Sequence, residues 1–96
     1  MADKVRIDKY LWSIRIFKSR SIATEACKEG KVRLKGEPAK PSAMITVGDI
    51  IDVTKDGFRL RYKALQLIEK RVSPLLAKPC YEDLTPEEEI NKYKSW

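Results

Sequence analysis

The stretch RIDKYLWSIRIFKSRSIATEACKEGKVRLKG, residues 6–36, opens with an apolar pattern of helical period. Ile7, Leu11 and Ile14 fall on one side when successive residues are turned by about 100° around a helix axis. The segment FKS that follows breaks this pattern. We therefore predict a first helix over about residues 6–15.

A second helix is predicted over residues 20–29 of the same stretch. Ser19 is a suitable N-cap, and Gly30 suits the left-handed conformation that commonly follows the last turn. The predicted apolar side of this helix consists of Ile22, Ala23, Ala26 and Cys27. A polar stripe with a spacing of four residues consists of Arg20, Thr24 and Lys28.

After the second helix the apolar period changes to two, which is typical of strands. A short strand is predicted over residues 31–35, and a long connection over residues 37–49. Strands over 50–53 and 58–64 are joined by Asp56-Gly57, a dipeptide that suits hairpin turns with positive φ. In the last strand the cationic side chains are expected to point outward; they are Arg59, Arg61 and Lys63.

The predicted fold class is α+β, a two-helix motif packed on a small antiparallel sheet with a short C-terminal helix. That last helix is expected to have Thr85 as N-cap, Pro86 as its first residue and Glu88 at the third position of a capping box. Two segments are predicted, a domain over residues 1–72 and an acidic tail over residues 73–96.

Charge is high and unevenly distributed along the chain. Charged residues make up 35% of the 96 residues, against about 25% in average proteins. Residues 1–80 contain 18 Lys and Arg against 9 Asp and Glu, whereas residues 81–96 contain 2 against 5. A basic body favours a polyanionic partner, either nucleic acid or an anionic membrane. No apolar run approaches the roughly 20 residues that span a bilayer, so we expect no membrane partner.

Most enzyme and metal chemistry is excluded by the residues that the chain lacks. There is no histidine and there are only two cysteines, Cys27 and Cys80. Ser-His and Cys-His nucleophiles and four-ligand zinc sites therefore cannot form. Residues 1–8 show no apolar segment of a secretory signal, so we expect a cytoplasmic protein with reduced thiols. We predict no catalytic residue, no metal and no cofactor, and an inert, buried Cys27.

The cluster of cations near the two predicted helices stands above the background. Isolated lysines such as Lys55 are expected to be solvated surface residues. Ser19 adds the backbone donors of a helix N-terminus, a ready phosphate site. The short polar stripe suits contact with phosphates, which favours structured RNA that is recognised by its shape. The cationic members of the cluster are Arg6, Lys9, Arg15, Lys18, Arg20, Lys28, Lys31 and Lys40.

Two other functions remain open from the residues alone. A DNA-binding protein could use the same cationic face. A protein-interaction adaptor could bind an acidic partner through that face and use Tyr93 and Trp96 of the tail as an apolar anchor.

Residues 6–53 resemble the RNA-binding domain named after small-subunit ribosomal protein four. The matching segments are RIDKYLW, FKSR, GKV, KG, KPS and VGD, in that order. The RIDKYLW opening, FKSR and KPS are most similar to the heat-shock protein fifteen family. Known members continue into a long basic C-terminal helix, whereas this chain has the acidic segment YEDLTPEEEINKYKSW at residues 81–96.

The resemblance implies a non-catalytic, stand-alone binder of ribosomal RNA. Its expected target is the large ribosomal subunit that carries peptidyl-tRNA after a stalled ribosome splits, with tRNA as a further partner, and we expect a monomer. Asp8 is expected to orient a neighbouring arginine or the helix start. The RNA contacts that the resemblance implies are Arg6, Lys9, Arg15, Lys18, Ser19 and Arg20, extended by Lys28, Lys31 and Lys40.

Overall fold

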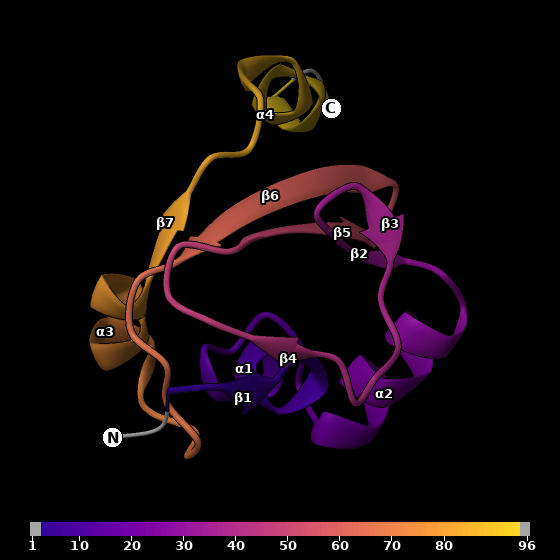
Figure 1. Ribbon diagram of the computed structural model, residues 1–96. Coiled ribbons are helices and arrows are strands. Elements are labelled where there is room, and N and C mark those ends of the chain that lie inside the picture. Colours follow the sequence, from indigo (N-terminus) through magenta and orange to yellow (C-terminus); the bar gives the residue numbers. More distant parts are fainter. Residues whose placement is uncertain (1–2, 95–96) are drawn as a thin grey trace.

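The computed structural model, which describes residues 3–94, has two layers (Figure 1). One layer is an antiparallel sheet of five strands in the order β3-β2-β5-β6-β7. The other contains α1 (Ile7–Ser13) and α2 (Arg20–Lys28), with the pair β1 (Val5–Arg6) and β4 (Met44–Ile45) beside α1. The predicted α+β class, with two helices on a small antiparallel sheet, is confirmed.

Helix α1 forms because its apolar residues share the face that packs on the core. Ile7, Tyr10, Leu11 and Ile14 are all at most 1% exposed. The helix is shorter than predicted, because Arg15 has a φ of 69° and turns the chain away. The N–H of Ile16 then bonds back to the carbonyl of Leu11, which closes the end of the helix.

Helix α2 begins at the predicted residue and ends one residue earlier than predicted. The Ser19 hydroxyl accepts a hydrogen bond from the N–H of Ile22, and Gly30 has a φ of 77°. Ala23, Ala26 and Cys27 are buried, and their small side chains let α2 lie close to α1. The prediction for Ile22 is wrong: its side chain is 48% exposed, because the core face of α2 is narrower than the predicted apolar side.

The burial of Cys27 is confirmed. Burial, together with the nearby charge of Asp8, raises the pKa of its thiol to about 11. The thiolate is therefore scarce at neutral pH, and the side chain serves as a small apolar group. Both cysteines are free and buried.

The sheet is built around two tight turns with positive φ. Lys35-Gly36 joins β2 (Val32–Leu34) to β3 (Glu37–Pro38), and Asp56-Gly57 joins β5 (Ile50–Lys55) to β6 (Phe58–Ala64). In each turn both residues have φ between 53° and 84°, as the favoured two-residue hairpin turns require. The predicted alternation is confirmed. The fully buried or nearly buried residues on the inner face of the sheet are Val32, Ile51, Val53, Tyr62 and Ala64.

Four short strands were absent from the predicted elements. Strand β1 precedes α1 and pairs with β4, the connection over residues 37–49 contains β3 and β4, and β7 (Tyr81–Asp83) adds an edge strand beside β6. A two-residue strand shows no period, and β7 is mostly acidic. Their pairing is therefore decided by their neighbours in space.

The segment after residue 73 consists of α3 (Pro74–Ala77), the 3₁₀ helix η1 (Lys78–Cys80), β7 and α4 (Glu87–Lys94). Its first part packs on the same core, where Ala77 and Cys80 are buried. The Tyr10 hydroxyl donates a buried hydrogen bond of 2.7 Å to the carbonyl of Cys80. The division into two segments at residue 72 stays a prediction.

The predicted start of α4 is wrong by one residue. The helix begins at Glu87, and the carbonyl of Pro86 accepts from the N–H groups of Glu89 and Ile90. The Thr85 hydroxyl instead accepts a hydrogen bond of 3.1 Å from the N–H of Arg61 in β6. A tertiary partner therefore replaces the predicted capping box.

Candidate nucleic-acid interface

A buried carboxylate joins the two helices beneath the cationic cluster. The carboxylate of Asp8 is 1% exposed, and Arg6 donates to it through Nε at 3.2 Å and Nη2 at 3.0 Å. The N–H of Lys9 donates at 2.7 Å, and the Thr24 hydroxyl donates from α2 at 2.9 Å. A buried charge needs such partners to offset its loss of water. Asp8 therefore orients Arg6 and the start of α1, as expected.

These contacts also set the protonation state of Asp8. Burial by itself raises the pKa of this carboxyl, but the hydrogen bonds from Arg6 and Thr24, the charge of Arg6 and the Lys9 N–H together outweigh it. The pKa of Asp8 therefore lies below its ordinary value, and the group is ionised at neutral pH.

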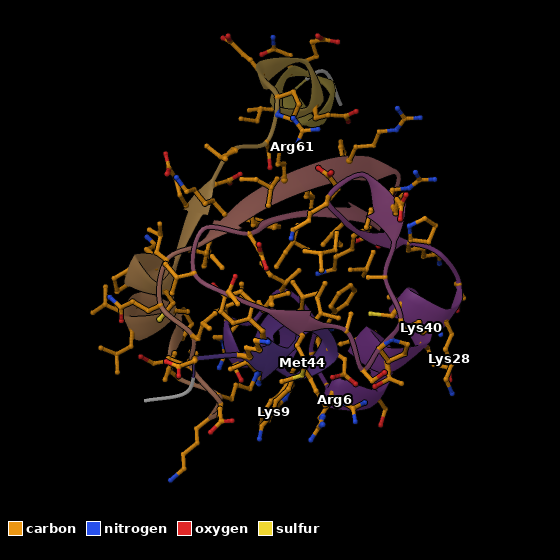
Figure 2. The ribbon with its side chains drawn as sticks, in the orientation of Figure 1. Arg6, Lys9, Lys28, Lys40, Met44 and Arg61 are labelled. Atoms are coloured by element: carbon orange, nitrogen blue, oxygen red, sulfur yellow. The ribbon has the colours of Figure 1, made fainter. Side chains whose placement is uncertain are left out.

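The Asp8–Thr24 bond places the polar stripe of α2 beside the N-terminus of α1. Arg20 and Lys28 lie one turn before and after Thr24, and both are exposed. Figure 2 shows Arg6, Lys9, Lys28 and Lys40 along one edge of the molecule. We call the exposed and half-exposed group formed by Arg6, Lys9, Lys18, Ser19, Arg20, Lys28 and Lys40 the α1–α2 surface.

The N-terminus of α2 adds backbone donors to this surface. Ser19 caps the helix through its 3.1 Å bond to the Ile22 N–H, and Lys18 and Arg20 on either side are exposed. The first turn of a helix leaves further N–H groups for an anion, and its dipole favours negative charge. This end of α2 can therefore hold a phosphate between two cations.

Two of the predicted contacts lie apart from the others. Arg15 donates through Nη1 to the carbonyl of Val72 at 3.3 Å, which directs it toward the segment before α3. Lys31 forms an ion pair of 2.9 Å with Glu29, and both line a hollow on the side of α2 that faces β5. The structure therefore brings seven of the nine predicted residues to one surface.

Two residues differ from what the sequence indicated, one among the cations of the α1–α2 surface and one outside it. Met44 is 48% exposed and lies opposite Arg6 in the β1–β4 pair, among the labelled cations of Figure 2. No sequence signal marked it, because β4 has only two residues. The expectation for Lys55 is wrong. Its Nζ donates to the carbonyl of Ile16 at 2.7 Å and lies 5.7 Å from the centre of the Phe17 ring.

Neither a metal site nor a membrane-spanning helix is found among the described residues. Over residues 3–94, no group of three or more Cys, Asp or Glu is arranged to hold a metal ion. Within that range no helix has both the length and the apolar character needed to cross a bilayer. Trp96 and the side chain of Tyr93, the predicted apolar anchor of an adaptor, lie outside the described part.

Residues 5–51 match the model of the S4 domain family. A heat shock protein 15 homolog of Aeromonas salmonicida is 36% identical over 83% of this chain, and the chain spans 61% of that relative's length. An RQC P-site tRNA stabilizing factor of Listeria innocua is 30% identical over 91% of this chain and 94% of its own.

A solved structure shows the same fold over almost the whole chain. The trimeric structure of Vibrio cholerae heat shock protein 15 has a TM-score of 0.83 and 28% sequence identity, over 96% of this chain and 91% of that chain. The likeness includes the two-helix layer that carries the α1–α2 surface. This chain belongs to the family of small S4-domain proteins that contains heat shock protein 15 and the RQC P-site tRNA stabilizing factors.

Proposed function

We propose that this protein is a non-catalytic RNA-binding protein that binds structured RNA through the α1–α2 surface. The observation that carries the proposal is the Asp8 network. It fixes two helices against each other and holds exposed cations of both along one edge. A rigid row of cations neutralises phosphates at the spacing that they have in a folded RNA backbone. Shape and charge therefore select the ligand together.

RNA is favoured over DNA by the residues of the exposed stripe. A helix that reads base edges in the major groove presents Asn, Gln or Arg along its exposed face. The stripe of helix α2 has only one such side chain, Arg20 at its first turn, followed by Thr24 tied to Asp8 and Lys28 at its last turn. Such a helix suits phosphate contact and recognition of shape, which dominate binding to folded RNA.

The proposed target is the large ribosomal subunit, through ribosomal RNA or the tRNA bound there. This step rests on relatives named P-site tRNA stabilizing factors, one of which this chain matches over 94% of its length. The protein would then act in the cytoplasm, where ribosomes translate. Contacts are proposed for the α1–α2 surface, with Arg15 and Lys31 at its margins.

Cosedimentation with separated ribosomal subunits tests this function. The double variant Arg20→Ala/Lys28→Ala removes two exposed cations from the surface and is expected to lower affinity for the large subunit at least about ten-fold. The matched control is Lys70→Ala/Lys78→Ala, which removes two exposed lysines from outside the α1–α2 surface. Equal losses from both variants would reduce the effect to net charge and contradict the proposed surface.

We also propose a monomer in solution, although the Vibrio cholerae relative has a trimeric structure. The large apolar side chains with high exposure come from separate elements of the fold. They include Ile22 of α2, Met44 of β4, Leu75 and Leu76 of α3, and Ile90 of α4. Light scattering on the purified chain distinguishes the two states by mass, and a trimer at micromolar concentration would overturn the monomer.

A further inference from the structure

The outer face of the sheet, which points away from α1 and α2, carries a second group of cations. Arg33, Asp52 and Arg61 lie directly opposite one another across β2, β5 and β6, and Arg59 follows opposite Thr54. Asp52 forms an ion pair of 2.7 Å with Arg61. A single carboxylate therefore lies among three arginines, and this part of the face keeps a net positive charge.

Helix α4 lies over this face and brings acidic residues to it. Figure 1 shows α4 beyond β6, on the side of the sheet opposite α1 and α2. The segment before it is held to β6 by two bonds to Arg61. The N–H of Leu84 donates to the carbonyl of Arg61 at 2.8 Å. The N–H of Arg61 in turn donates to the Thr85 hydroxyl at 3.1 Å.

A hollow separates the arginines from the acidic first turn of α4. Its volume is about 600 Å³, and it is lined by all three arginines from the sheet and by Glu88 and Glu89 from α4. Figure 2 places Arg61 directly beneath α4, on the opposite side of the molecule from Arg6 and Lys9. The carboxylates of α4 therefore line the same hollow that an anionic ligand of the arginines would enter.

We propose that the outer face of the sheet is a second RNA-binding surface, and that acidic α4 competes with RNA phosphates for it. This inference rests on the proposed function and extends it. The protein would bind two RNA segments, one on each side, and the second would displace α4 or share the hollow with it. Two phosphate-binding faces on opposite sides suit a protein that bridges RNA elements.

The test measures the second surface in a protein whose first surface is weakened. In the Arg20→Ala/Lys28→Ala background, Glu88→Gln/Glu89→Gln removes two charges from the rim of the hollow. The matched control, Glu37→Gln/Glu69→Gln, removes two exposed carboxylates from elsewhere on the chain. Fluorescence anisotropy with a labelled RNA hairpin reports affinity, and thermal melting verifies that each variant is folded.

The Glu88→Gln/Glu89→Gln change is expected to raise hairpin affinity about three- to ten-fold more than the control pair does. Adding Arg33→Ser/Arg59→Ser to it is expected to cancel the gain, because the only arginine left in the hollow is then Arg61, which is paired with Asp52. An equal gain from the control pair, or a gain that survives the loss of the two arginines, would overturn the second surface. Failure of the proposed function has a separate sign: Arg20→Ala/Lys28→Ala alone would leave hairpin affinity unchanged.

Discussion

The two cationic faces of this protein use carboxylates in opposite ways. On the α1–α2 surface, Asp8 is buried below the cations and holds Arg6 in place while the Arg6 side chain stays 43% exposed. On the outer face of the sheet, Glu88 and Glu89 line a hollow together with the arginines. A carboxylate beneath a cation orients it, whereas one in front of it competes with the ligand. The net charge of a face therefore does not show whether the face is free to bind RNA.

Salt provides the largest expected effect and tests the first face. If the α1–α2 surface neutralises about five phosphates, log K should fall with log salt at a slope of roughly −3.5 to −4.5. Anisotropy titrations of the labelled hairpin at several salt concentrations measure this slope. A response near zero would contradict phosphate-dominated binding on the first face. The same titrations on Glu88→Gln/Glu89→Gln, made in the wild-type background, test the second face. A steeper slope of log K against log salt than in the wild type would support competition between α4 and RNA on the outer face of the sheet.

Removing the buried carboxylate is expected to have the next largest effect. Asp8→Ala removes the acceptor of the Lys9 N–H, leaves the Thr24 hydroxyl with only the Arg20 carbonyl at 3.0 Å, and frees Arg6. We expect the free energy of unfolding to fall by about 2 kcal/mol because buried hydrogen bonds are lost. The loss is not larger because the freed Arg6 side chain can be solvated by water. Urea denaturation measures the loss, and RNA affinity should fall with it.

The control for this change is Asp3→Ala, which removes an exposed carboxylate close by in sequence. It should leave the unfolding free energy nearly unchanged. If Asp8→Ala were as stable as Asp3→Ala, the role of Asp8 in fixing the helix pair would be refuted.

Acid provides a smaller and more selective effect. The pKa of Asp8 lies below its ordinary value of 3.8 in the folded protein. The stabilisation from the ionised Asp8 is therefore fully present above about pH 4. It is lost as the pH falls through the lower, folded pKa, because between the two pKa values the unfolded chain binds a proton that the folded protein does not. Denaturation between pH 5 and pH 2.5 should show a shallower decline for Asp8→Asn than for the wild type. Parallel curves would contradict the assignment.

Much of the two-helix motif was predictable because its signals are local. Ser19 caps the helix that follows it, Gly30 ends that helix, and Asp56-Gly57 forms the predicted hairpin turn. Each of these depends on backbone geometry within a few residues. The basic cluster was predictable for a similar reason, since cations on one helix face recur at a fixed spacing.

The errors lie where a distant partner wins over a local preference. Thr85 has the sequence of an N-cap, but its hydroxyl accepts from the backbone of Arg61 across the sheet. Lys55 looks like a solvated residue, but it reaches the carbonyl of Ile16. Ile22 has the right helical position for the core, but its neighbours in space leave it exposed.

Local signals were enough to predict the fold class, the helix pair, the hairpin and the cationic character of the molecule. These follow from periodicity, capping and turn chemistry, which act between residues close in the chain. Three relations appear only in the folded chain: Asp8 is a buried link between two helices, Met44 lies among the cations, and acidic α4 faces the arginines of the sheet. Those relations join residues far apart in sequence, and no local pattern encodes the distance between two side chains that meet only when the chain has folded.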